Sequence, residues 1–266
     1  MSKLLIKPQG GEGCVTKVTP ESAGWRYVGF ELHKLKAGET AAAETGEREV
    51  CLVWISGSGR ASADGSDFGS LGGRASPFEG EPAALYVPAG SDWSVTAESD
   101  LELAVCSAPG EAGALPARVI RPEDLSRETR GKGTNTRYVT NILPEEQTAQ
   151  SLLVVEVITP GGHSSSYPPH KHDADNLPYE SSLEETYYHR VRPDSGFAFQ
   201  RVYTDDRSLD EAMAVEDGDV TLVPKGYHPV AACHGYDLYY LNVMAGPVRT
   251  WKFNNAKEHE WLLSAD

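Results

Sequence analysis

The chain has 266 residues, a formal net charge of −15 and a pI near 5.0. This length fits one large domain or two domains of roughly 130 residues, and the negative charge argues against nucleic acid or an anionic membrane surface as a partner. No stretch approaches the ~20 apolar residues of a membrane span, and the apolar run near the first residue is too short for a signal peptide, so we expect a cytoplasmic protein. Four cysteines without CxxC spacing indicate neither a disulfide framework nor a thiolate metal site.

The first half of the chain is predicted to consist of short strands joined by turns. Its composition, with 26 Gly and 17 Pro in the whole chain, suits this architecture. The predicted strands are rich in β-branched and aromatic residues and are bounded by Gly, Pro or Asp. They lie at residues 30–32, 49–54, 84–87 and 101–105, and a Pro-x-Gly turn follows the third at 88–90.

Charge, Pro and Gly dominate the middle of the chain. We predict a linker over residues 116–150 that crosses between two halves, with a strand at 136–141 that packs on one of them. The Gly-Lys-Gly sequence at 131–133 lacks the spacing and the following helical pattern of a phosphate-binding loop. The expected domains are therefore residues 1–115 and 151–266.

The second half repeats the pattern of the first. Predicted strands at residues 155–157, 185–189, 220–223 and 238–242 follow in the same order, with a second Pro-x-Gly turn at 224–226. We therefore predict an all-β chain that arose by internal duplication. Helical signals are weak, and short helices are expected only at residues 208–214 and 257–263.

Seven of the eight histidines lie in the second half, and His170 and His172 form a His-x-His tripeptide. Side chains alternate along extended chain, so these two imidazoles project from one face of a strand. A carboxylate from the next strand, Glu184 or Glu185, and His228 from a later strand would complete a three-nitrogen, one-oxygen metal site. Imidazole and carboxylate suit zinc, iron, manganese or nickel. We expect one divalent ion per chain, zinc first, with manganese and iron as alternatives.

These motifs resemble those of the cupin superfamily, small antiparallel jelly-roll barrels that hold one metal ion. The Gly-x5-Pro-x-Gly spacing from Gly218 to Gly226 matches the second cupin motif, although His228 follows after one residue where the family has two. Residues 173–182 lengthen the gap between the His-x-His pair and Glu185, and we expect them to form a polar loop over the mouth. The resemblance implies a bicupin, two jelly-roll-type antiparallel β-barrels related by duplication.

The ligand carboxylate is expected to be Glu185 rather than Glu184. An internal match of the two halves aligns Glu185 with Glu49, and the Glu-x-Tyr pattern of the family places Tyr187 two residues after the ligand. On a strand, Glu185 shares its face with Tyr187 and His189.

At finer grain, the second half resembles the uronate ketol-isomerase branch of the bicupins. The first half matches more loosely, because it has Ala-Ala-Ala-Glu at 41–44 where the His-x-His pair would stand, so we expect no metal there. The strings that carry the resemblance lie at residues 167–173, 183–190, 200–204 and 223–246.

This resemblance implies an aldose–ketose isomerisation in myo-inositol catabolism, from 5-deoxy-D-glucuronate to 2-deoxy-5-keto-D-gluconate. Such a reaction needs a Lewis acid that polarises the carbonyl and a base that carries a proton between adjacent carbons, unless hydrogen moves as hydride. Glu185 and Tyr187 are the expected catalytic residues.

The substrate carboxylate favours the planar fork of an arginine. Arg201 on a predicted central strand is the first candidate and Arg249 the second, while Tyr203 and Tyr240 are expected to contact the sugar. The expected partner is a small sugar acid, with no nucleic acid and no membrane, and the oligomeric state, monomer or homo-oligomer, stays open.

Three other functions fit the same motifs: another uronate ketol-isomerase, a cupin iron dioxygenase with the same ligands, and a non-enzymatic sugar-binding cupin. The complete ligand set disfavours a storage role. The lack of a DNA-binding helix pair or a basic segment disfavours a regulator.

Overall fold

The computed structural model describes residues 2–264, which form two compact units. We call them the N-terminal barrel, made of residues 8–126 and 142–154, and the C-terminal barrel, made of the residues up to Lys7, residues 127–141 and the chain from Val155 onward. All of the segment predicted as a linker, residues 116–150, belongs to one barrel or the other.

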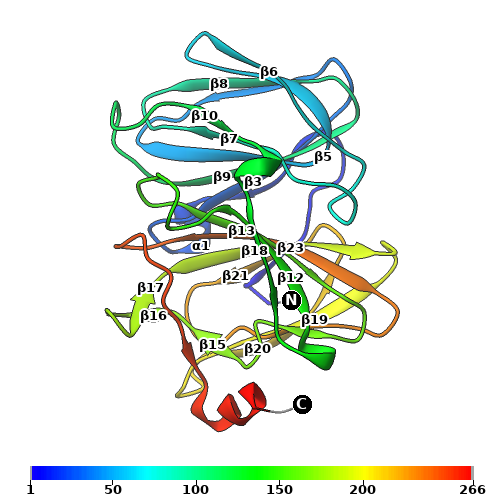
Figure 1. Cartoon of the computed structure of the whole chain (residues 1–266), viewed down its shortest axis with the longest axis vertical. Coiled ribbons are helices and arrows are strands. Elements are labelled where there is room, and N and C mark those ends of the chain that lie inside the picture. Colours follow the sequence, from blue (N-terminus) through cyan, green and yellow to red (C-terminus); the bar gives the residue numbers. More distant parts are fainter. Residues whose placement is uncertain (1, 265–266) are drawn as a thin grey trace. The chain divides into compact units, whose positions relative to one another are not determined.

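The N-terminal barrel is a nine-stranded sheet whose strands pair antiparallel. The long strand β5 closes it, because its first half pairs with β7 and β9 and its second half with β6 and β8. The path runs β10-β7-β5-β9-β3-β2 (Figure 1). Off this path, β6 and β8 pair with β5, and β4 pairs with β8. The elements are β2 (Gly13–Val18), α1 (Pro20–Ala23), β3 (Gly29–Leu35), β4 (Thr40–Glu44), β5 (Arg48–Ala63), β6 (Ser66–Arg74), β7 (Ala84–Val87), β8 (Asp92–Ala97), β9 (Leu101–Pro109), β10 (Arg118–Ile120) and the 3-10 helix η1 (Pro122–Asp124).

The C-terminal barrel combines a seven-stranded sheet of order β1-β21-β18-β23-β13-β12-β11 with a four-stranded sheet of order β14-β22-β19-β20. Two short ribbons, β15 with β24 and β16 with β17, complete it. The elements are β1 (Leu5–Ile6), β11 (Ser126–Arg130), η2 (Gly133–Asn135), β12 (Arg137–Leu143), β13 (Leu153–Thr159), β14 (Ser164–Ser165), β15 (His170–Lys171), β16 (Asp173–Asn176), β17 (Glu180–Ser182), β18 (Glu184–Arg192), β19 (Phe197–Tyr203), β20 (Asp210–Glu216), β21 (Val220–Val223), β22 (Val230–Ala232), β23 (Asp237–Ala245), β24 (Asn254–Asn255) and η3 (Lys257–Leu263).

The predicted all-β fold and the repeated strand order are confirmed, and the tail at 257–263 is helical as expected. The helix predicted at 208–214 is wrong, because most of this segment is strand β20, in which Met213 and Val215 are buried and alternate with exposed residues along the edge of β19. The insertion at 173–182, predicted as a loop, is the hairpin β16–β17 (Figure 1). None of the helices within residues 2–264 has the length and apolar character needed to cross a membrane.

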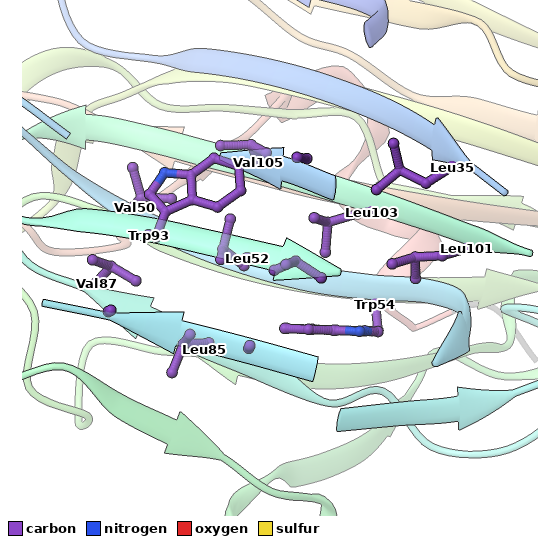
Figure 2. Close-up of a cluster of buried hydrophobic side chains, with 14 of the residues drawn as sticks. Leu35, Val50, Leu52, Trp54, Leu85, Val87, Trp93, Leu101, Leu103 and Val105 are labelled. Atoms are coloured by element: carbon purple, nitrogen blue, oxygen red, sulfur yellow. The ribbon is translucent and has the colours of Figure 1, made fainter. Parts of the chain in front are cut away.

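Apolar side chains fill the inside of the N-terminal barrel (Figure 2). On β5, Val50, Leu52 and Trp54 point into this core, where they join Leu103 of β9 and Trp93 of β8. All five are at most 4% exposed, so this interior has the character of a packed hydrophobic core.

Strand register identifies the position in the N-terminal barrel that matches Glu185. Val87, just before the first Pro-x-Gly turn, pairs with Val50, whereas Val223, just before the second turn, pairs with Glu185. Val50 therefore takes the place of Glu185, and the sequence match of Glu185 with Glu49 is wrong by one residue. A one-residue step reverses the face of a strand, so Glu49 and Val50 lie on opposite faces of β5.

Glu49 instead binds the chain that leads into β13. Its fully buried carboxylate accepts hydrogen bonds from the backbone N–H groups of Gln150 at 2.8 Å and of Ser151 and Leu152 at 2.6 Å each. The hydroxyl of Tyr86 donates a fourth at 2.6 Å. A buried charge is tolerated when such donors satisfy it.

Glu49→Gln is expected to destabilise the protein by about 2–4 kcal/mol, because either orientation of the amide turns an NH2 group toward two of these donors. Chemical denaturation measures the free energy of unfolding. The control is Glu47→Gln, an exposed position on the turn just before β5, which should change stability by no more than about 0.5 kcal/mol. Equal effects of the two substitutions would contradict the role assigned to Glu49.

Candidate metal centre

Three segments of the C-terminal barrel bring the predicted ligands together. His170 lies on β15 and His172 follows directly after it, Glu185 lies on β18, and His228 lies between β21 and β22. Gly226 makes the last placement possible: its φ of +90° suits glycine, and a Cβ there would lie 2.4 Å from the carbonyl oxygen of Tyr203.

The imidazoles of His172 and His228 converge on one oxygen of Glu185. Oε2 of Glu185 lies 3.1 Å from Nε2 of His172 and 3.3 Å from Nε2 of His228. The two rings are 4.9 Å apart, and the candidate ligand atoms of all three residues lie within 4.8 Å of one another. All three side chains are at most 2% exposed.

Backbone carbonyls fix how these two imidazoles are oriented. Because a carbonyl only accepts, Nδ1 of His172 donates to the carbonyl of Leu183 at 3.1 Å, and Nδ1 of His228 donates to that of Gly226 at 2.9 Å. Each Nε2 is thus left to face Glu185. Nε2 of His228 is buried and has no hydrogen-bond partner among the described residues. A hydrogen bond from Nδ1 to a backbone carbonyl, with Nε2 left free, is typical of histidines that bind a metal ion through Nε2.

Burial sets the charge of the cluster. It lowers the pKa of His228 to about 4 and that of His170 well below its usual range. Burial also disfavours a charged His172, but the hydrogen bond and the negative charge of Glu185 outweigh it and raise the pKa of His172. His170 and His228 are therefore neutral, and imidazole nitrogens beside one carboxylate are a donor set that suits a divalent metal ion.

His170 lies beside the three-residue cluster rather than within it. Its ring centroid is 4.9 Å from that of His228 and 6.3 Å from that of His172, and it packs against Phe253 at 4.5 Å. His170 also lines the adjacent cavity. The structure therefore gathers three of the four predicted ligands tightly and places the fourth at the edge of the cavity.

A wall of buried aromatic and polar side chains continues from the cluster along β18. The hydroxyl of Tyr187 is 2.9 Å from that of Ser166, and the Tyr187 ring lies 4.9 Å from that of Tyr240. Further along, Nε2 of His189 on the seven-stranded sheet bonds Oε1 of Gln200 on the four-stranded sheet at 3.0 Å. This bond joins the two sheets across the interior, and it identifies His189 as a structural residue.

Two predicted substrate contacts lie elsewhere. Arg201 is on the exposed face of β19 and makes two hydrogen bonds of 2.7 Å to the carboxylate of Asp210. Its neighbour Gln200 takes the inward face, so the prediction that Arg201 binds the substrate is not supported. Tyr203 packs against Tyr227, with ring centroids 5.1 Å apart, in a separate small cluster with Ala256.

A cavity of about 570 Å³ opens beside His170. This volume is in the range of small-molecule sites. Its basic side is formed by Arg130, Lys132 and Arg137, from the segment predicted as a linker, and its apolar side by Phe253 and residues 262–263. The sequence could have indicated the basic side of this cavity, since four basic residues fall within residues 127–137 of an acidic chain.

A second group of possible ligands lies on the N-terminal barrel at Cys14, Glu31 and His33. There Glu31 is already paired, at 2.7 Å with Lys17 and at 3.0 Å with His33. The side chains are partly exposed, and the ammonium group of Lys17 already neutralises the Glu31 carboxylate that a metal ion would need.

Fold and site together define a double-barrelled cupin. At the level of fold alone, the chain is similar to an oxalate decarboxylase from Lactobacillus farciminis, with a TM-score of 0.68 and 15% identity over 100% of this chain and 91% of that one. The match is much stronger to an IolB-like protein of Salmonella typhimurium LT2, with a TM-score of 0.96 and 54% identity over 98% and 99% of the two chains.

Residues 4–262 match the model of the KduI/IolB family, and the chain belongs to that family. It is 56% identical to a protein of Geobacillus kaustophilus (strain HTA426) named 5-deoxy-glucuronate isomerase, over 100% of this chain and 97% of the relative. It is 49% identical to a protein of the same name from Shouchella clausii (strain KSM-K16), over 99% and 100% respectively.

We expect one equivalent of divalent metal per chain, lost on substitution of His228. His228→Ala should weaken metal binding at least tenfold, as measured by metal analysis after dialysis. His234→Ala, an exposed histidine of the same barrel, and His33→Ala in the second group should both keep the full equivalent. Two equivalents in the unmodified protein, or a loss of metal in the His33 variant, would contradict a single centre.

Proposed function

We propose that this protein converts 5-deoxy-D-glucuronate to 2-deoxy-5-keto-D-gluconate with one divalent metal ion held by His170, His172, Glu185 and His228. The observation that carries the proposal is the buried His172–Glu185–His228 cluster beside a cavity. This cluster occurs in a chain that shares 56% identity with a protein named 5-deoxy-glucuronate isomerase. The reaction belongs to myo-inositol catabolism, and zinc is the first choice of metal, followed by manganese and iron.

A bound metal would act as a Lewis acid that polarises the carbonyl and stabilises negative charge on the two reacting oxygens. The protein supplies its fixed surroundings. Leu183 and Gly226 orient two imidazoles through their carbonyls, and burial keeps water away from Glu185. His170 is the ligand at the open side, where it borders the cavity that would admit the sugar.

Glu185 and Tyr187 are assigned different tasks in the transfer of hydrogen between C1 and C2. Burial and the charge of Glu185 raise the pKa of Tyr187 well above its usual range. Tyr187 therefore keeps its proton near neutral pH and serves as a hydrogen-bond donor to a substrate oxygen rather than as a base. Glu185, the carboxylate of the cluster, is the candidate proton carrier.

Tyr240 completes this wall of the site. Its hydroxyl bonds that of Ser165, and burial raises its pKa, so it too stays protonated. We propose that it contacts a sugar hydroxyl.

The N-terminal barrel is proposed to carry no catalytic metal. Val50 stands where Glu185 stands in the other barrel, and Leu52, Trp54 and Trp93 fill the space inside. Its role is structural.

Glu185→Gln is expected to lower the rate of ketose formation at least 100-fold, because it removes a carboxylate from both the ligand set and the proton path. The assay follows 5-deoxy-glucuronate by NMR with the metal-loaded protein. Glu184→Gln is the matched control, since Glu184 points to the other face of β18. It should keep most of the activity. A chelated sample should be inactive and recover when metal is restored.

Other outcomes of this assay would contradict different parts of the proposal. Turnover of another uronate but not this one would place the error in the substrate, and metal-dependent oxygen consumption would indicate a cupin dioxygenase. Sugar binding without turnover would indicate a non-enzymatic cupin. Turnover that survives chelation would contradict the role of the metal.

A further inference from the structure

We infer that Arg137 binds the carboxylate of the substrate, from the cavity wall beside His170. This inference rests on the proposed function for the identity of the ligand, a sugar acid. Carboxylate binding, which the sequence had suggested for Arg201, is thereby assigned to the first residue of β12.

Arg137 is the first residue of β12 and lines the cavity. One of its terminal nitrogens, Nη1, donates to the backbone oxygen of Asn135 at 3.0 Å and to the side-chain oxygen of the same residue at 3.2 Å. Asn135 is itself held, because its amide donates to the carbonyl of Tyr167 at 3.1 Å. The guanidinium is thus fixed on one side, while its remaining donors have no bond within residues 2–264.

Arg137 makes no direct ion pair within the part of the chain that the structure describes, although the charge of Glu128 acts on it from a longer distance. Arg130 pairs with Glu128, Arg201 with Asp210, and neither of these carboxylates is within ion-pair distance of Arg137. The Arg137 side chain is half-buried, and burial lowers its pKa. A partly desolvated cation without a hydrogen-bonded counter-ion costs free energy that a directly bound anion would recover.

The position of Arg137 matches the shape of the substrate. In 5-deoxy-glucuronate the carboxylate, on C6, is at the opposite end from the reacting carbons C1 and C2. The cavity is lined by His170 at the metal cluster and by Arg137 as well. One extended sugar acid can therefore reach both.

Two other cationic side chains, Arg130 and Lys132, line the same cavity, but Arg137 is better suited to bind a carboxylate. Guanidinium presents a planar pair of donors that matches a carboxylate, whereas ammonium acts as a point charge. Lys132 is exposed, and Arg130 already bonds Glu128 at 2.6 Å and lies over the ring of Trp251. Of the three, Arg137 is the residue whose guanidinium is held in place by Asn135 and still has unused hydrogen-bond donors.

The test compares acid and neutral ligands in the metal-loaded protein. Arg137→Met should raise KM for 5-deoxy-glucuronate roughly 10- to 100-fold, the value of a charge-assisted hydrogen bond. It should leave turnover of the neutral C6 amide within about twofold and keep one equivalent of metal. Arg137→Lys should fall between. Arg201→Met, on the exposed face, is the control and should behave like the unmodified protein.

A binding measurement separates this inference from the proposed function. Calorimetric titration with D-glucuronate and with neutral D-glucuronamide should show a preference for the acid that Arg137→Met abolishes. If the unmodified protein binds the acid through Arg137 but does not isomerise 5-deoxy-glucuronate, the proposed function fails and the inference stands. If Arg137→Met binds the acid as well as the unmodified protein does, or if neither protein prefers the acid, the inference is overturned.

Discussion

The buried carboxylate of Glu185 is the constraint around which the C-terminal barrel is organised. A charge at 2% exposure needs partners, and the two imidazoles at 3.1 Å and 3.3 Å are its neighbours in the barrel. Each imidazole needs its own backbone acceptor, and a glycine at 226 lets the chain turn tightly enough to present the second one. The same requirement explains why apolar residues replace this set in the other barrel, where Val50 leaves no charge to compensate.

The two barrels show how one strand position can serve opposite purposes after a duplication. In the C-terminal barrel, Glu185 on β18 points inward to the imidazoles. In the N-terminal barrel, the glutamate of the corresponding strand β5 is one residue earlier. Glu49 therefore points outward and accepts hydrogen bonds from residues 150–152. A shift of one residue thus separates a candidate ligand from a residue that anchors the chain.

The sequence predicted the strands, and it predicted that His172, Glu185 and His228 lie together, because both depend on short-range patterns. Alternation identifies strands, and the His-x-His pair, Glu185 and His228 follow motifs with defined spacing. It did not anticipate that Arg201 lies on the exposed face of β19, because the inward face of a strand cannot be assigned without its neighbours. The helix expected at 208–214 was wrong because pairing with β19 overrode a weak helical pattern. Arg137 was not singled out, because a strand predicted at 136–141 does not by itself indicate that its first residues line a cavity.

The pairing of β1 with β21 has a consequence for synthesis of the chain. Leu5 and Ile6 pair with Thr221 and Val220, more than two hundred residues later. During vectorial synthesis these two residues emerge before the N-terminal barrel, and the whole of that barrel follows before their partners exist. Closing so long a loop is slow relative to local pairing. The N-terminal barrel can therefore fold early, whereas the barrel with the histidine cluster must wait until both its distant segments have left the ribosome.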